Sequence, residues 1–396
     1  MKKSILLVAA ALILSPLSVL GHDVEGDHLH AHLAGAENPP QVGPKGGTVS
    51  VQYEGHTVSF TLSDKYHFPD RPDIKKNLRA AHGASKTLPN GDQLFGLSNF
   101  PDFIGVRQDG TSYILETDAD MKNSHGMGLV QSSDGETLIL AADNVRKTLW
   151  IVDQSGKKRH GVTAPEGLPF TITDATGANR FAYAVDGYSG GKGNFVHRID
   201  PNTGKHTGNR WGGYGKAPGK FTTDHGIHFD AKSERFFVAD RENRRVQVFN
   251  SAMEKPFVLD LPTFDKWGAR PCDVDVLNTE QGDFMLVGCL DAPGRYVLNP
   301  DGSFKTVKQG DRDVRVTKDD YPGACFYIYH LGAETLADTK LVAQIHPKRD
   351  FNIATATHIH NAAWWKHDNG DVYVVFYSWN PGDEAGFVKI DVSRNE

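Results

Sequence analysis

The stretch from Trp211 to Asn250, WGGYGKAPGKFTTDHGIHFDAKSERFFVADRENRRVQVFN, decides the fold. A Gly-rich loop leads to a short predicted strand at 226–229, and a polar turn separates this strand from a second one at 236–238. The alternating segment 245–249 closes the unit as a further strand. A unit of this size cannot bury both faces of its own sheet, so we expect copies elsewhere in the chain.

The same order of strands and turns recurs, and we count six rounds. Runs rich in Val, Ile and Phe alternate with Asp-Gly and Asn-Gly turns, helical periodicity is almost absent, and 41 of 396 residues are glycine, as in a turn-dense β protein. The pattern predicts an all-β, six-bladed β-propeller. Five or seven blades stay open, because the segment 301–352 is irregular. The rounds begin near residues 79, 123, 168, 211, 270 and 357, and the fifth runs to residue 302, after which an extended connection leads to the last round.

The first 21 residues have the features of a secretory signal peptide. Lys2 and Lys3 precede an apolar core, and small residues follow up to Gly21. The alternative is a membrane anchor, which the short apolar run and the interrupting Pro16 oppose. We therefore expect a periplasmic or secreted protein that has no membrane contact once the signal peptide is cleaved.

The remaining sequence divides into three predicted parts. Residues 22–47 form a flexible His-rich leader, residues 48–78 a β-hairpin that closes the propeller or forms a flap, and residues 79–396 the propeller itself. The leader either captures a transition metal or is a solvated tail with incidental histidines. These histidines are His22, His28, His30 and His32.

Charge and cysteine content narrow the class of protein. The formal net charge of −6 becomes −8 when Lys2 and Lys3 leave with the signal peptide, which argues against non-specific binding to nucleic acid. We expect a monomer.

Three cysteines can form at most one disulfide. Cys272 and Cys289 are the favoured pair, which leaves Cys325 over, and buried unpaired thiols are the alternative.

Histidines begin the predicted inner strands of alternate rounds. His125 lies in SHGM, His225 in DHGI and His360 in THIHNAA, with His358 as the alternative in the last round. In the third and fifth rounds, the corresponding positions are Pro169–Phe170 and Pro271–Cys272, and the first round has His82 in AHGA. Alternate blades of a six-bladed ring are related by threefold symmetry, so the three histidines should converge on the axis.

Three imidazoles with one open position make a catalytic zinc site. The sequence therefore predicts Zn bound by His125, His225 and His360, with His82 either as a fourth metal-binding group or as a partner of a ligand. A single histidine at the start of a strand is more often a hydrogen-bonded structural residue, and a metal-free pore lining is the alternative for the whole group.

Several motifs resemble those of the peptidylglycine α-amidating lyase family, within the wider NHL-type propeller superfamily. They are WG…G…PGKF…DHGI…VADREN at 211–243 and VDGY at 185–188, and the resemblance covers roughly residues 79–390. It implies zinc on three such histidines, a catalytic role for Tyr188 and a role for Arg241 in binding a carboxylate or stabilising negative charge. A phenol near zinc can have its pKa lowered and act as a general base.

Each of these two residues also has an ordinary structural interpretation. Tyr188 can be a blade-edge tyrosine packed under a loop, and Arg241 can form a turn salt bridge with Asp240 or Glu242. The chain also departs from the family pattern, because the family's early arginine in a His-Arg-Gly context has no counterpart. Asn361 stands where the family has an aspartate that helps to hold a structural Ca²⁺, so Ca is a weaker prediction than Zn.

The resemblance implies a zinc-dependent lyase that cleaves the C–N bond of a peptidyl-α-hydroxyglycine and releases a peptide amide and glyoxylate. Its substrate would then be a small molecule or a peptide. Two alternatives are a non-catalytic NHL-type propeller that binds a protein or glycan, and a different metal-dependent lyase or hydrolase on the same scaffold. The histidines argue against the first alternative. They also argue against the second, because enzymes of that class usually bind a hard cation through carboxylate and Asn ligands.

Overall fold

The computed structural model describes most of the chain from Gly46 onward. The predicted signal peptide and almost all of the His-rich leader lie outside the described residues, as does His82. Within the described part, no helix is long and apolar enough to cross a membrane. The described ranges are 46–78, 83–264, 267–290, 294–309, 312–353, 356–378 and 385–395.

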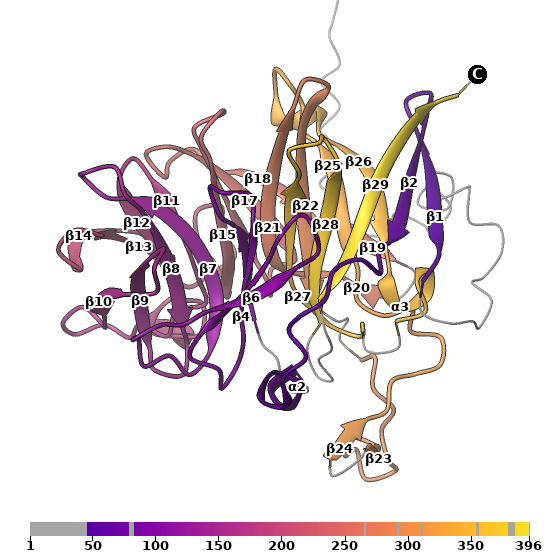
Figure 1. Ribbon diagram of the computed structural model, residues 1–396, viewed down its shortest axis with the longest axis horizontal. Helices are drawn as coiled ribbons and strands as arrows, with labels where there is room; N and C mark the ends of the chain where they lie inside the picture. The colour runs from indigo at the N-terminus through magenta and orange to yellow at the C-terminus, as the bar shows by residue number, and fades with distance from the viewer. Residues whose placement is uncertain are drawn as a thin grey trace, which may run out of the picture.

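Six antiparallel sheets follow one another and form a six-bladed β-propeller, which confirms the predicted fold (Figure 1). The first strand of each blade contacts the first strands of its neighbours, and these strands therefore surround the axis. From the axis outward, the first three blades contain β3 (Ser85–Thr87), β4 (Gln93–Gly96), β5 (Phe103–Val106) and β6 (Ser112–Leu115); β7 (Ser124–Gln131), β8 (Thr137–Asp143), β9 (Thr148–Asp153) and β10 (Lys158–Val162); and β11 (Asp174–Ala178), β12 (Phe181–Val185), β13 (Phe195–Asp200) and β14 (Lys205–Gly212).

The other three blades follow the same plan, with one extra strand in the last. They contain β15 (Asp224–Asp230), β16 (Arg235–Asp240), β17 (Arg245–Asn250) and β18 (Phe257–Asp260); β21 (Arg270–Thr279), β22 (Gly282–Leu290), β25 (Phe326–His330) and β26 (Lys340–Ile345); and β27 (Ile359–Lys366), β28 (Val372–Ser378), β29 (Gly386–Arg394), β2 (His56–Leu62) and β1 (Thr48–Tyr53).

Strands from both ends of the chain build the sixth blade. β2 pairs with β29 from His56↔Arg394 to Leu62↔Val388, and β1 pairs with β2 on its outer side. In Figure 1 the indigo hairpin β1–β2 lies beside the yellow C-terminal strand β29. The hairpin at Glu54–Gly55 thus completes the ring, with Phe60 fully buried against the blade.

The fifth blade corrects the strand assignment made from sequence. Residues 292–302 were counted in the same round as β21 and β22, but the third and fourth strands of this blade are β25 and β26, after a long insertion. The insertion leaves the blade between β22 and β25 and carries the small hairpin β23 (Thr306–Gln309) and β24 (Arg312–Arg315). It protrudes below the propeller in Figure 1.

Short elements complete the described structure. They are β19 (Thr263–Phe264), β20 (Trp267–Gly268), α2 (Pro72–Leu78), α3 (Pro347–Asp350) and two 3-10 turns, Gly190–Lys192 and Leu336–Asp338.

The core consists of apolar layers between neighbouring blades. Because middle strands such as β8, β16 and β28 are covered on both faces, their sequences read as nearly continuous apolar runs, TLILAAD, RFFVAD and VYVVFYS. Each of the six buried clusters joins two adjacent blades; Phe95 and Trp365, for example, pack between the first and sixth blades. These layers hold the inner strands at fixed positions around the axis.

Candidate metal centre

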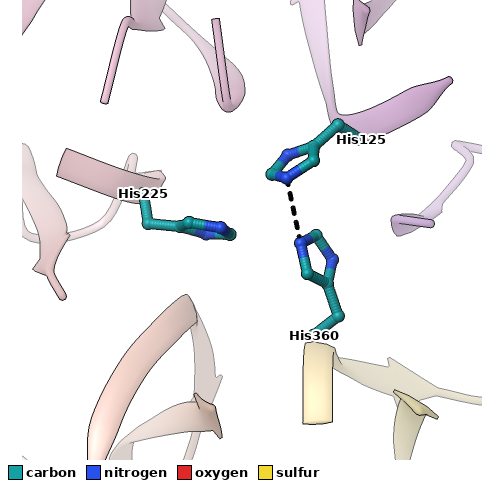
Figure 2. A group of neighbouring side chains, drawn as sticks. All are labelled: His125, His225 and His360. Carbon is teal, nitrogen blue, oxygen red and sulfur yellow. Dashed lines mark hydrogen bonds between the residues drawn. The ribbon is translucent and has the colours of Figure 1, made fainter. Parts of the chain in front are cut away.

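Three histidines from alternate blades meet on the axis (Figure 2). His125 comes from β7, His225 from β15 and His360 from β27, and each is only 2% exposed. Their ring centroids form a nearly equilateral triangle, with separations of 4.4, 4.9 and 5.0 Å. The convergence expected from the alternation of the blades is therefore present in the structure.

A β-bulge places each of these histidines. The register between the first and second strands shifts between Ser124 and Gly126, between Asp224 and Gly226, and between Ile359 and Asn361, so the histidine is the extra residue in each strand. A bulge bends the strand and re-aims a side chain that regular alternation would direct elsewhere. Here it turns each imidazole toward the axis.

The neighbouring blade fixes the tautomer of each imidazole. The Nδ1 atoms of His125 and His225 lie 2.7 Å from the carbonyl oxygens of Thr173 and Cys272, and Nδ1 of His360 lies 3.0 Å from that of Gly83. A carbonyl only accepts, so each Nδ1 carries the proton and donates it. In the neutral ring, Nε2 then presents a lone pair to the centre.

The donor atoms are close enough to share one ion. Nε2 of His125 lies 3.1 Å from Nε2 of His360, and one ligand atom from each of the three histidines lies within 4.8 Å of the others. Two nitrogens bound to one tetrahedral zinc would be about 3.3 Å apart, because Zn–N bonds are about 2.0–2.1 Å long. The histidines line a cavity of about 10 Å³, roughly the room for one water molecule or ion.

Burial keeps the imidazoles neutral. It lowers the pKa of His125 to about 3, and it lowers the pKa of His225 and His360 well below the usual value, with Arg241 and the neighbouring histidines acting in the same direction. Converging lone pairs repel one another unless a cation lies between them, and a proton is disfavoured here. The donor set therefore fits a metal ion, and three neutral imidazoles suit Zn²⁺ among others.

Tyr188 and Arg241 lie directly against this cluster. The Tyr188 hydroxyl is 3.2 Å from Nε2 of His225, and Nη1 of Arg241 donates to that hydroxyl over 3.0 Å. Tyr188 follows β12 in the third blade and Arg241 follows β16 in the fourth, so two neighbouring connections supply them. The structure brings together five of the six residues singled out from sequence; His82 lies outside the described part of the chain.

The protein groups alone do not lower the pKa of Tyr188. Burial raises it, and the adjacent Arg241 guanidinium opposes that rise. The lowering expected from sequence therefore depends on the charge of a bound metal. Burial also opposes the charge on Arg241, but Tyr188, Cys272 and Glu242 hold its pKa above the usual range, so Arg241 stays charged.

The structural interpretation considered for Arg241 is met in part. Nε of Arg241 lies 2.9 Å from Oε1 of Glu242, which is the expected turn salt bridge, while Nη1 of the same guanidinium holds Tyr188. Asp240, the other candidate partner, pairs instead with Arg245 over 2.7 Å. The salt bridge and the contact with the centre coexist.

A layer of carboxyl and amide groups lies next to the histidines. Asp174, Asp273 and Asn361 line the same cavity, the Asn361 amide donates to Asp273, and Ser85 donates to Asn361 over 2.6 Å. Burial raises the pKa of Asp273 to about 7 and that of Asp174 well above its usual value, and in each case a neighbouring aspartate adds to the rise.

Lys86 and Asp275 form an ion pair in the same group of inner strands, with 3.1 Å between Nζ and Oδ1. Burial opposes the negative charge on Asp275, but Lys86 and His228 outweigh it and hold the pKa of Asp275 well below its usual range. The polar side chains of these inner strands thus pair with one another.

Other expectations need correction or refinement. His358 lies beside the cluster, 6.3 Å from His360 between ring centroids, whereas His360 is the member of the triad. In the third blade the inner strand begins at Asp174, so Thr173 stands opposite His125 and not Pro169–Phe170. The favoured Cys272–Cys289 disulfide is absent: Cys272, Cys289 and Cys325 are all buried thiols.

Sequence reasoning missed the carbonyl groups that fix the imidazoles. They belong to the odd-numbered blades, which lack an axial histidine in the described residues, and a backbone carbonyl leaves no trace in residue type. Asp174 could have been found by aligning DATGA with the inner strands of the other blades.

Comparisons with known proteins concern the fold. No protein-family model and no curated protein matches the sequence. Among solved structures, a streptogramin B lyase is 11% identical with a TM-score of 0.46, covering 84% of this chain and 98% of its own. Virginiamycin B lyase from Staphylococcus aureus is 12% identical with a TM-score of 0.44, covering 83% and 99%. The WD40 repeats of RRP9 are 12% identical with a TM-score of 0.44, covering 79% and 94%.

Proposed function

We propose that this propeller is a zinc-dependent lyase that cleaves the C–N bond of a peptidyl-α-hydroxyglycine, giving a peptide amide and glyoxylate. One observation carries the proposal: a hydrogen-bonded series, Arg241 to Tyr188 to His225, ends on the convergent imidazoles. An acid–base group, Tyr188, therefore contacts both a candidate metal ligand and an anion-binding group. Export and a monomeric state belong to the same proposal, and Ca²⁺ stays a prediction.

The chain's own residues account for the movement of the proton. In the reaction, the carbinolamide hydroxyl loses its proton, the C–N bond breaks, and the amide nitrogen gains a proton. Tyr188 is placed to take the first proton and return it to the leaving nitrogen, because its hydroxyl faces the cluster and Arg241 stabilises the phenolate. Bound zinc supplies a Lewis acid that polarises the substrate oxygen.

Metal binding and the role of Tyr188 support each other. In the neutral tautomer fixed by the Cys272 carbonyl, Nε2 of His225 accepts from the Tyr188 hydroxyl. When that nitrogen serves as a metal ligand, the Tyr188 proton loses its acceptor, and Tyr188 in its phenolate form would accept from a substrate hydroxyl at the centre. Arg241 keeps the phenol in place through Nη1 and offers positive charge to the carboxylate of the substrate.

The test combines metal analysis with turnover. We expect the purified protein to hold about one Zn per chain and to release glyoxylate from an N-acyl-α-hydroxyglycine. The double variant His125→Ala/His225→Ala should lose both, whereas His56→Ala, which removes an exposed histidine, should retain both. A protein that binds no metal after zinc reconstitution would refute the enzyme proposal and favour a binding propeller. Zinc without glyoxylate would indicate a different metal-dependent reaction.

A further inference from the structure

Two guanidinium groups beside the metal centre share a single carboxylate. Nε of Arg241 lies 2.9 Å from Oε1 of Glu242, and Nη1 of Arg270 lies 3.2 and 3.3 Å from Oε2 and Oε1. Arg241 and Glu242 follow β16 in the fourth blade, whereas Arg270 begins β21 in the fifth. The group therefore spans two blades.

The carboxylate is the outermost member of this group. The side chain of Glu242 is 33% exposed, against 15% for Arg241 and 19% for Arg270. Glu242 lies in the turn between β16 and β17, and no other described ion pair holds it. Glu242 is the member of the group that water reaches most easily, so its carboxylate can rotate into solvent and be hydrated there. The two guanidiniums are more buried and would remain.

The site that Glu242 occupies adjoins the proposed reaction centre. Arg241 binds Glu242 through Nε and the Tyr188 hydroxyl through Nη1, so one guanidinium separates the carboxylate from the phenol. Arg270 is two residues from Cys272, whose carbonyl orients His225. An anion in the position of the Glu242 carboxylate would therefore lie beside the centre, and its remaining atoms would extend toward Tyr188.

We propose that Glu242 is a displaceable internal counter-ion: it fills an anion site formed by Arg241 and Arg270, and the carboxylate of a ligand replaces it there. The inference rests on the proposed function for its choice of a carboxylate. It assigns Arg270 as a specificity-determining residue and predicts that small 2-hydroxycarboxylates bind whereas their uncharged amides do not. A planar guanidinium fork matches a carboxylate better than it matches a neutral amide.

The test uses glycolate, a 2-hydroxycarboxylate without the amide nitrogen, and glycolamide as its uncharged counterpart. Binding is measured by isothermal titration calorimetry on the zinc-loaded and the metal-free protein. Glu242→Gln removes the internal competitor and should tighten glycolate binding about tenfold, while Arg270→Gln should weaken it about tenfold, the effect of roughly one charge-assisted hydrogen bond. Neither variant should change the binding of glycolamide.

Two further variants serve as controls. Arg244→Gln also removes one positive charge, from the turn that carries Glu242, but Arg244 is not one of the two arginines in the proposed anion site. It should change glycolate affinity much less than Arg270→Gln does. Glu242→Asp keeps the charge on a shorter side chain and should give an affinity near that of the unaltered protein. Thermal melting confirms that each variant is folded.

The outcomes separate this inference from the proposed function. If Glu242→Gln leaves glycolate affinity unchanged or weakens it, Glu242 supports the arginines and the displacement is wrong. If glycolate follows the expected pattern in metal-free protein but α-hydroxyglycine is not cleaved, the anion site stands and the lyase proposal fails. Turnover with an unchanged KM in Glu242→Gln and Arg270→Gln leaves the lyase standing and overturns the anion site.

Discussion

At the scale of single residues, the centre depends on side chains that hold one another in a defined protonation state. Tyr188 donates to an imidazole whose own proton is fixed by a backbone carbonyl, and it accepts from a guanidinium. Each hydrogen bond in this series has one possible direction, because the Cys272 carbonyl can only accept and Arg241 can only donate. The phenolic proton therefore points toward Nε2 of His225.

Replacing Tyr188 by Phe should remove the proton-transfer group and leave the metal site intact. We expect kcat for α-hydroxyglycine cleavage to fall by about 10²–10⁴-fold, the usual contribution of a positioned acid–base group, with zinc content unchanged. Glyoxylate release and elemental analysis measure the two effects. Tyr214→Phe is the matched control, since Tyr214 is 59% exposed. Full activity in Tyr188→Phe would exclude this residue as the base.

His346, a buried histidine outside the centre, predicts how the stability of the protein depends on pH. Burial lowers the pKa of His346 to about 3, with Arg349 acting in the same direction, while the unfolded chain titrates near 6.5. Below about pH 6.5 the unfolded state binds a proton that the folded state excludes, so His346 reduces stability as pH falls toward 3. His346→Gln should remove this loss.

The expected size of the effect follows from the proton linkage. Relative to His346→Gln, the unaltered protein should lose about 2 kcal/mol of unfolding free energy between pH 7 and pH 5. Denaturant unfolding of both proteins at the two pH values measures the difference, in which contributions from other titrating groups cancel. A difference that does not change with pH would show that folding does not lower the pKa of His346.

At the scale of elements, the inner strands approach one another so closely that only glycine fits at certain positions. A Cβ atom on Gly226 would lie 2.6 Å from the Cys272 carbonyl oxygen and 2.7 Å from Cα of Asp273. Gly126 stands in the same relation to Thr173 and Asp174. These glycines follow the axial histidines and let the next blade bring its carbonyl to the imidazole.

Gly226→Ala should therefore weaken both the fold and the metal site. Overpacking of this kind typically costs about 1–3 kcal/mol, and the displaced Cys272 carbonyl would release the ring of His225. Thermal melting and zinc competition titration measure the two effects. Gly191→Ala is the control, because a Cβ there meets nothing within 4 Å. Equal zinc affinity in both variants would contradict a link between strand spacing and the metal site.

The element scale also shows where sequence reasoning ends. The three histidines could be predicted because each heads a strand with a similar motif, and three copies in alternate blades imply convergence. The bulges could not be predicted, since an extra residue in one strand is defined only by its partner strand. The same holds for Thr173: aligning the third blade at Pro169–Phe170 missed the strand that begins at Asp174.

At the scale of the whole molecule, the ring is closed by the hairpin β1–β2 on the last blade. Phe60 is fully buried in the cluster between the fifth and sixth blades. Phe60→Ala should lower the unfolding free energy by about 3–5 kcal/mol, the usual cost of such a core truncation. Val392→Ala shortens a side chain that is 63% exposed in the adjacent strand β29, and should have little effect. Thermal melting distinguishes the two, and equal melting temperatures would show that the hairpin does not stabilise the ring.

The overall fold could be predicted because six rounds of the same strand pattern are visible in the sequence. The fifth blade was assigned incorrectly, because the segment 291–325 interrupts it and separates β25 and β26 from β22 in the sequence. The cysteines show a related limit. Cys272 and Cys289 do lie on paired strands, yet strand pairing alone does not set the geometry that a disulfide needs.

Closure of the ring also has a consequence for biosynthesis. His360 belongs to the last blade, and its ring is fixed by Gly83 of the first. The last blade itself is completed by pairing of β29 with β2, a strand made much earlier. A ribosome makes β2 before β29, so the nascent chain holds an unpaired strand edge until β29 has been made. The three nitrogens can therefore gather only after translation of the last blade, and a metal that they bind would be loaded only after that point.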